Sequence, residues 1–232
     1  MRRFLICLFT LLICNLPIWA QFSSAIKVGV SDNRMIPYEE PVSSRFGFNL
    51  GWEGEYDFLK WCGLKVGASF SQKGSGLRIP EKSLQYEYIE DIQHITLDYI
   101  TLPISIAVKK NFAIQDREIG ICLGGGIYYS YLFSGNASIK VANKYGGGII
   151  NNNVTRNNNI TFDSSKQIEL ERFNPNDIGY HFYFDINYKR ISIEAGYQYG
   201  WSTIVSSGPF VMMQGCHNES FYVSLLYYLK KH

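Results

Sequence analysis

Long apolar segments, cysteines and clustered charge are all scarce in this sequence. After Ala20 no continuous apolar run reaches the roughly 18 residues of a membrane-spanning helix, which excludes a helical membrane protein. The 22 basic and 20 acidic residues leave a net charge of only +2. No basic run is concentrated enough to indicate nucleic acid as a partner.

Cysteine usage excludes two further classes. Only Cys62, Cys122 and Cys216 follow Ala20, and an odd number at wide spacing is not a disulfide framework. No CxxC or close pair of histidines accompanies them, so the pattern does not indicate a metal site. No glycine-rich phosphate loop opens a helix either. We expect no cofactor.

The first residues have the pattern of a targeting segment. Arg2 and Arg3 precede an apolar stretch from Phe4 to Trp19, and the small residue Ala20 ends it. This order predicts a secretory signal peptide over 1–20, followed by a single domain over 21–232. Cys14 raises the alternative of a lipoprotein signal, although such signals carry a small residue where Ile13 stands.

The clearest periodicity in the chain lies between Ile178 and Trp201. Apolar and polar residues alternate here in two runs, on either side of a short polar turn at Lys189-Arg190. Alternation predicts β-strands, and the short turn predicts a hairpin. Tyr and Trp stand at the ends of the apolar face. That arrangement, over a length of about 9–11 residues, is typical of strands that cross an outer membrane between two aromatic girdles.

Similar alternation recurs along the chain and brings the total to about eight strands. The six further segments are 26–31, 46–57, 64–71, 100–109, 119–131 and 221–229. Long connections (32–45, 72–95, 135–177 and 203–218) alternate with short ones, as in transmembrane barrels of the bacterial outer membrane. Pro103 falls inside a strand and predicts a bulge.

We therefore expect an all-β fold: an eight-stranded, antiparallel, up-and-down transmembrane β-barrel. Short turns and both termini would lie in the periplasm, and the long loops outside. The alternative is a soluble, lipocalin-like barrel or sandwich. Its apolar faces would point inward, and the strand pattern alone does not exclude it.

Several short motifs resemble those of one family. They are Phe46-Gly47-Phe48-Asn49, Ser71-Gln72-Lys73-Gly74, Tyr99-Ile100-Thr101-Leu102-Pro103-Ile104, Gly124-Gly125-Gly126-Ile127-Tyr128 and Gly196-Tyr197-Gln198-Tyr199-Gly200. In order and spacing they resemble the PorT-like outer-membrane β-barrel family of Bacteroidetes, among small barrels of the OmpA and OmpX type. The resemblance covers almost all of the mature chain. It implies an eight-stranded outer-membrane barrel and, through the named member, a link to protein secretion by the type IX system. The resemblance assigns a functional role to no residue of this sequence.

If the apolar faces meet lipid, the polar faces line the lumen. The charged residues expected there are Lys27, Glu53, Glu55, Asp57, Lys65, Lys109, Asp185 and Glu194. An eight-stranded barrel has room for side chains but not for an aqueous channel, so we expect these charges to pair as a salt-bridged plug. Aromatic residues expected at the lipid interfaces are Trp52, Tyr56, Tyr129, Tyr131, Tyr188, Tyr199 and Trp201.

The functional hypothesis is a non-enzymatic outer-membrane protein with a structural or protein-interaction role, such as a secretion accessory. Its partners would be outer-membrane lipid and, through the external loops, other envelope or secretion proteins. The Asn- and Gly-rich loop at 135–177 is the main candidate contact region, with a tether that binds nothing as the equal alternative. Two other functions stay open: a narrow pore for small solutes or ions, and a rim enzyme that uses His181.

Overall fold

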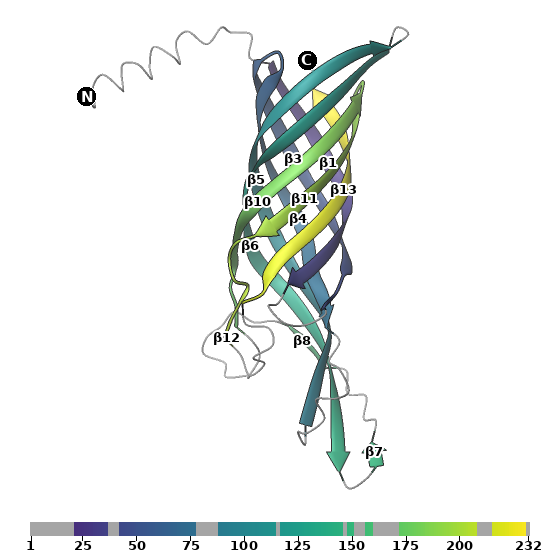
Figure 1. Ribbon diagram of the computed structural model, residues 1–232, viewed down its shortest axis with the longest axis vertical. Helices are drawn as coiled ribbons and strands as arrows, with labels where there is room; N and C mark the ends of the chain where they lie inside the picture. Colours follow the sequence, from purple (N-terminus) through teal and green to yellow (C-terminus); the bar gives the residue numbers. More distant parts are fainter. Residues whose placement is uncertain are drawn as a thin grey trace, which may run out of the picture.

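Eight long strands make a closed barrel in the computed structural model (Figure 1). The structure describes residues 21–36, 42–77, 88–114, 117–145, 148–150, 156–159, 172–207 and 215–230. The barrel strands are β1 (Gln21–Ile36), β3 (Arg45–Leu59), β4 (Cys62–Leu77), β5 (Tyr88–Ile114), β6 (Arg117–Tyr145), β10 (Asn176–Tyr188), β11 (Ile191–Gly200) and β13 (His217–Lys230). In this described part of the chain, no helix has the length and apolar character needed to cross a membrane.

The barrel closes through one pairing between the first and the last strands of the wall. Around the wall the order is β10-β11-β13-β1-β3-β4-β5-β6, and β6 pairs again with β10 from Ile119↔Tyr188 to Tyr131↔Asn176. All pairings between neighbouring barrel strands are antiparallel. The wall therefore has no free edge, as hydrocarbon surroundings demand.

The apolar faces of the strands point outward. Along β10 and β11 exposed and buried positions alternate, and Ile193 is 58% exposed while its neighbour Glu194 is 1% exposed. In water, such an exterior would leave aliphatic and aromatic area uncovered at a cost of about 25 cal/mol for each Å². The predicted barrel is confirmed in this respect, and the soluble alternative with inward apolar faces is wrong.

The two ends of the barrel differ. Short turns join β3 to β4, β5 to β6 and β10 to β11 at one end, called the turn end here. There Lys189 takes a φ of 54° in the two-residue turn between Tyr188 and Ile191. β1 begins and β13 ends at the same end, which is uppermost in Figure 1. The strands β1, β4, β6 and β11 end at the opposite end, called the loop end, and β3, β5, β10 and β13 begin there.

Strands continue further at the loop end than the sequence predicts. The expected connection at 72–95 is wrong at both of its ends, because β4 runs to Leu77 and β5 starts at Tyr88. The expected loop at 135–177 is wrong in part: β6 runs to Tyr145, and β10 starts at Asn176. A strand that does not face lipid needs no alternating apolar face. Backbone hydrogen bonds can therefore continue beyond the point where the alternation in the sequence ends.

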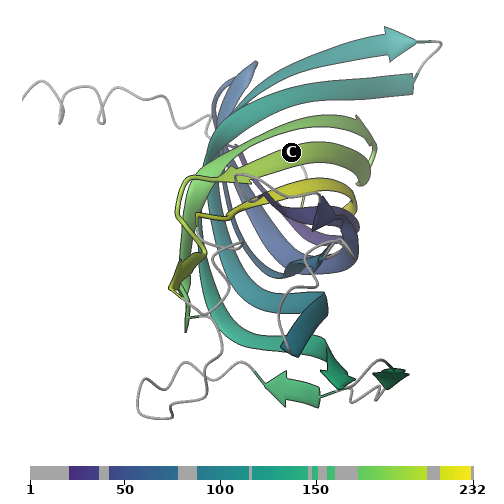
Figure 2. The same ribbon diagram turned by 60° about the horizontal axis from the view of Figure 1, so that its bottom comes forward.

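Short strands extend or flank the sheet in this region. β7 (Gly148–Ile150) and β8 (Arg156–Asn159) pair with β6, and β2 (Val42–Ser43) pairs with β4. β9 (Arg172–Phe173) pairs with β12 (Val205–Ser207). Figure 2 shows the long β5 and β6 ribbons reaching beyond the rim toward β7 and β8.

The bulge expected at Pro103 is also wrong. Pro103 pairs with Tyr128 of β6 in an unshifted register. On its other side the pairs Val66↔Ile104 and Ser69↔Thr101 keep the same register, with the ladder to β4 interrupted between them. Proline lacks an N–H donor, so one gap in the ladder accommodates it without an extra residue.

Candidate functional site

Two lysines and two glutamates form a closed ring of ion pairs inside the barrel. Lys27 Nζ lies 2.8 Å from Glu53 Oε1 and 2.5 Å from Glu194 Oε1. Lys65 Nζ lies 2.7 Å from the second oxygen of each of the same glutamates. The four side chains come from β1, β3, β4 and β11, and positive and negative charges alternate around the ring. This four-residue ring is therefore neutral, and each carboxylate binds both ammonium groups.

Two tyrosines cover the ring lysines. The Tyr183 ring lies 4.4 Å from Lys65 Nζ, and the Tyr222 ring lies 4.8 Å from Lys27 Nζ. Both distances suit a cation–π contact, which is stronger in a desolvated site. The ammonium groups thus face carboxylates on one side and aromatic rings on the other.

Glycines make room for these tyrosines. Across β6, β10, β11 and β13, the register aligns Gly124, Tyr183, Gly196 and Tyr222 in one inward-facing row. A Cβ added at Gly124 would lie 2.1 Å from Tyr183 Cζ, and one at Gly196 would lie 2.3 Å from Tyr222 Cζ. Alternation of large and small side chains lets the layer interdigitate in a narrow lumen.

The remaining predicted lumen charges gather toward the turn end. Lys109 Nζ lies 3.0 Å from Glu55 Oε1 and 2.5 Å from Asp57 Oδ1. Asp185 accepts a hydrogen bond from Ser192 Oγ and lies 4.0 Å from Lys65 Nζ. The structure therefore places all eight predicted residues in the lumen, as the ring and this adjoining group.

A third polar group near the loop end was not predicted. Lys73 Nζ lies 3.0 Å from Asp177 Oδ2, and the Tyr128 ring lies 4.5 Å from the same ammonium. Tyr128 OH and Asn218 Nδ2 donate to Asp177 Oδ2, and Ser202 Oγ donates to Oδ1. Sequence analysis assigned Lys73 to a connection. The alternation of side chains along the strand could have identified Lys73, because it is an even number of residues from Lys65 and therefore lies on the same polar face.

Apolar side chains also point inward at the loop end. The fully buried set there is Met35, Ile95, Leu97, Leu132 and Ile204. These inward-facing apolar residues were not predicted, because all five lie outside the strands expected from the sequence.

Little space is left between these side chains. One cavity of about 30 Å³ is lined by the four-residue ring and His181, and a second of about 30 Å³ by polar residues that include Asn33 and Lys73. A space of this size holds a water molecule or two. Around the four-residue ring and Lys73, side chains therefore fill most of the described lumen.

His181 does not lie at the rim as expected. It is 4% exposed and lines the first cavity, beside Lys27 and Glu194. Its Nε2 has no hydrogen-bond partner among the described residues. A substrate outside the barrel has no access to this imidazole, so the hypothesis of a rim enzyme that uses His181 is wrong in its geometry.

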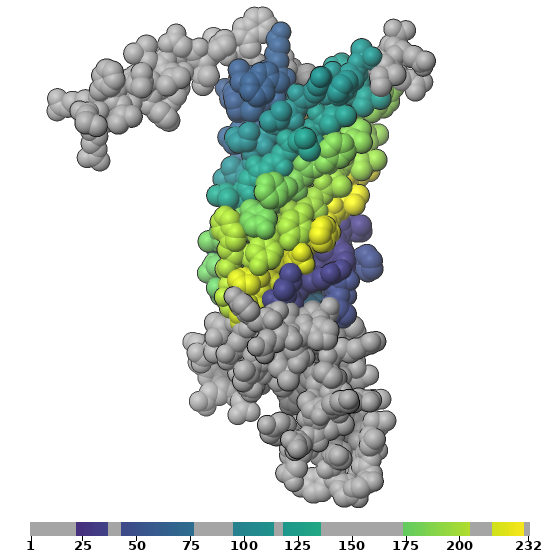
Figure 3. All heavy atoms as spheres, viewed as in Figure 1, coloured from purple at the N-terminus to yellow at the C-terminus, as the bar shows by residue number. Residues whose placement is uncertain are grey.

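The predicted interface aromatics point outward. Trp52, Tyr56, Tyr129, Tyr131, Tyr188 and Trp201 are exposed, and Tyr199 is partly so. Near the loop end the Tyr180 ring centroid lies 5.5 Å from that of Tyr199 and 5.8 Å from that of Trp201. The space-filling view in Figure 3 shows the side chains of neighbouring strands forming one continuous outer wall.

A closed antiparallel barrel with an apolar exterior and an ion-paired interior defines the class of small membrane-spanning β-barrels. The chain belongs to the family of the outer membrane protein beta-barrel domain, whose family model matches residues 19–205. It is therefore a protein of the bacterial outer membrane, and its outer wall contacts lipid.

Among solved structures, the chain is similar to Ail, the attachment invasion locus protein of Yersinia pestis. The identity is 14% over 90% of this chain and 99% of that one, with a TM-score of 0.44. It is also similar to Neisserial surface protein A, at 12% identity over 89% and 98% of the two chains and a TM-score of 0.40. No curated protein matches the chain.

The neutral ring predicts a large effect for Glu194→Gln. This change leaves Lys27 and Lys65 to share Glu53, with only Asp185 at 4.0 Å as a further carboxylate near Lys65, so the buried ring acquires a net positive charge. We expect the free energy of unfolding to fall by about 3–5 kcal/mol, measured by urea titration of the barrel in lipid vesicles. Glu118→Gln is the control, because Glu118 is exposed, and its effect should stay within about 0.5 kcal/mol. Equal effects of the two changes would contradict a structural role of the ring.

The alternating row predicts that Gly196 tolerates no side chain. In Gly196→Val, the new Cβ displaces the Tyr222 ring from Lys27 or pushes apart the β10 and β11 backbones. The free energy of unfolding should fall by about 1–3 kcal/mol in the same titration. Ala195→Val adds a similar volume on the outward face of the same strand and should change stability by less than about 0.5 kcal/mol. If both variants behave alike, Tyr222 is not held by Gly196.

Proposed function

We propose that the chain is a non-enzymatic interaction protein of the outer membrane that binds other envelope proteins through the sheet beyond its loop end. The observation that carries this proposal is the length of β5 and β6. Their pairing continues from Ile95↔Ala137 out to Tyr88↔Asn143, past the last pair of β4 with β5 at Ser75↔Ile95. At the roughly 3.3 Å rise per residue of a strand, this projection adds about 20 Å to the barrel.

The projecting sheet has the chemistry of a binding edge. Among the described residues, β6 is the neighbour of β5 between Tyr88 and His94, and no described strand pairs with the other side of β5 there. An edge strand offers unpaired N–H and C=O groups, which an extended segment of another protein can pair with. A partner that presents an extended strand fits this edge.

The filled lumen supports a role without transport or catalysis. The two cavities of about 30 Å³ hold water but give a solute no path, and the ring charges are already paired with one another. His181 lies among them without access from outside. The barrel then serves as an anchor that holds the projecting sheet at a fixed place.

The resemblance to the PorT-like family gives the proposal a more specific form. We place the turn end and both termini in the periplasm after cleavage of a signal peptide at 1–20, with aromatic belts in the two lipid interfaces. The projecting sheet then faces outside. There the chain, as an accessory of a type IX-like secretion assembly, contacts its partners.

Excision of residues 139–171, replaced by a short Gly-Ser linker, tests the interaction role. This variant removes β7, β8 and the end of β6 from Ile139 onward, which belong to the projecting sheet, and it keeps the strands of the barrel wall itself. We expect this variant to fold, which a gel band that shifts on boiling would show. We also expect it to lose the cross-links that the wild type forms with envelope proteins. Excision of 208–214, a second segment at the loop end, is the control and should keep the cross-links. Cross-links that survive the first excision would exclude the projecting sheet as the contact.

Planar-bilayer recording tests the pore alternative. A lumen filled by side chains should give no conductance steps, because an eight-stranded barrel has no aqueous channel. The sample is the folded wild-type protein at several salt concentrations, with a large porin as positive control. Steps that grow with salt and appear only with the folded protein would replace the interaction role by a pore.

A further inference from the structure

Two exposed lysines come together at the turn end of the barrel. Lys60 lies in the two-residue turn between β3 and β4, and Lys110 lies near the end of β5. The backbone N–H of Lys109 donates a hydrogen bond of 2.8 Å to the carbonyl oxygen of Trp61. This bond holds the turn that contains Lys60 against the end of β5.

The strand register places the two lysines opposite each other. Cys62 of β4 pairs with Val108 of β5. The bond between Trp61 and Lys109 continues this register by one residue, and the next step brings Lys60 beside Lys110. Like charges in opposite positions of a ladder repel each other, so an anion between them stabilises the arrangement.

The carboxylates near the turn end lie on the inner side of the wall and do not supply this anion. Glu55 and Asp57 pair with Lys109 in the lumen. Glu118 accepts a hydrogen bond of 2.8 Å from Asn111 Nδ2, and Asn111 lies on the same side of β5 as Lys109. Among the described residues, no carboxylate forms an ion pair with either exposed lysine.

Aromatic rings surround the two lysines on the outer side. Trp61 and Phe112 are both exposed, and Lys110 Nζ lies 5.2 Å from the centroid of the Phe112 ring. Aromatic residues of membrane proteins gather at the level of the lipid headgroups. The ammonium groups therefore lie at the depth where lipid phosphates are found.

Apolar side chains continue from this place toward the middle of the wall. Val108 and Ile106 follow Lys110 in steps of two along the outer face of β5, and Leu64 pairs with Ile106. All three are exposed to the surrounding lipid. A ligand with its phosphate at the lysines therefore has room for acyl chains in the direction of the bilayer core.

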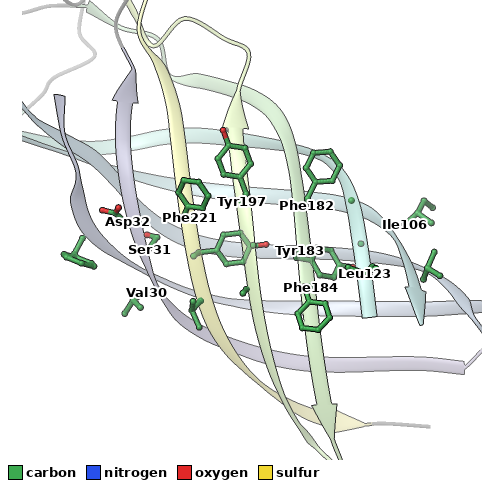
Figure 4. Close-up of a pocket in the computed structure, with 18 residues that line it drawn as sticks. Val30, Ser31, Asp32, Ile106, Leu123, Phe182, Tyr183, Phe184, Tyr197 and Phe221 are labelled. Carbon is green, nitrogen blue, oxygen red and sulfur yellow. The ribbon is translucent and has the colours of Figure 1, made fainter. Parts of the chain in front are cut away.

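The hollow on the outer wall shown in Figure 4 does not combine these features. It is lined mainly by aliphatic and aromatic side chains such as Val30, Leu123 and Phe184. The one ionised side chain among its lining residues, Asp32, is negative. Its lining accommodates acyl chains but offers no cation to an anionic headgroup.

We infer that the turn end binds an anionic phospholipid at Lys60 and Lys110. The phosphate lies between the two ammonium groups, the Trp61 and Phe112 rings flank the headgroup, and the acyl chains lie over Val108. A zwitterionic headgroup brings an ammonium group of its own, which the lysines repel. Charge therefore selects phosphatidylglycerol over phosphatidylcholine. The inference concerns the turn end and is independent of the projecting sheet.

The fluorescence of Trp61 tests the site, because bromine atoms on a neighbouring acyl chain quench an indole. In the reporter protein, phenylalanine replaces the other tryptophans of the full chain. The folded reporter is placed in phosphatidylcholine vesicles that contain increasing fractions of brominated phosphatidylglycerol or, in parallel, brominated phosphatidylcholine. We expect phosphatidylglycerol to associate roughly tenfold more strongly at low salt, because each lysine contributes up to about fivefold. Equal association of the two lipids would overturn the inference.

Variants of the reporter locate the preference. The double change Lys60→Gln and Lys110→Gln should make the two lipids associate equally. Lys189→Gln removes an exposed lysine from another hairpin of the same end and should keep the preference. A second reporter that retains only Trp201, near the loop end, should show no preference. All variants are first shown to be folded by the band shift on boiling.

Three results with these variants would refute the site. They are a preference that survives the double change, an equal loss in Lys189→Gln, and an equal preference at Trp201. The last two would indicate a general attraction of the protein for negative charge.

Inorganic phosphate distinguishes a lipid from a free anion. It offers similar oxygen atoms without acyl chains, so its addition should leave the preference at Trp61 as it is in sodium chloride of the same ionic strength. If phosphate abolishes the preference and chloride does not, the lysines bind a free anion and the lipid site is wrong.

Discussion

Hydrocarbon cannot hydrogen-bond a backbone amide or solvate a charge, and the rest of this structure depends on that constraint. The backbone meets it by closing β6 onto β10. The side chains meet it by keeping charge inside, where Lys27 and Glu194, 167 residues apart, share the four-residue ring with Lys65 and Glu53. A register slip of one residue on any of these strands would send a charge to the lipid face, so the ring specifies register as well as neutrality.

Much of the fold could be predicted from the sequence because lipid enforces a strict two-residue period. The alternation from Ile191 to Trp201 identifies both the strand and its lipid face. The same reasoning loses the strand ends at the loop end, where β5 and β6 continue as a hydrogen-bonded ladder without a lipid face to pattern them. Pro103 shows a different limit, because the sequence cannot distinguish a bulge from a single missing hydrogen bond.

The alternation along each strand also predicted that the charged residues lie in the lumen, but it could not identify their partners. Which lysine meets which glutamate depends on how far the strands are staggered around the barrel, and a single sequence does not reveal stagger. The cover of Tyr183 on Lys65 needs the opposing Gly124, which lies on another strand. The Lys73–Asp177 pair was missed because both residues lie beyond the predicted strand ends, and the inward-facing Leu97 and Leu132 were missed for the same reason.

The shared ladder of β5 and β6 has a mechanical consequence. The two strands stay paired from the turn end at Ile114↔Arg117 to Tyr88↔Asn143, with two local register shifts on the way. Their hydrogen bonds run perpendicular to the strands. A pull on β5 alone, along the strand direction and relative to β6, therefore loads many of these bonds in shear at once and does not open them one by one. The projecting sheet and the barrel then act as a single stiff rod, so that a force applied at the outer end of β5 and β6 is transmitted through the barrel wall to the turn end.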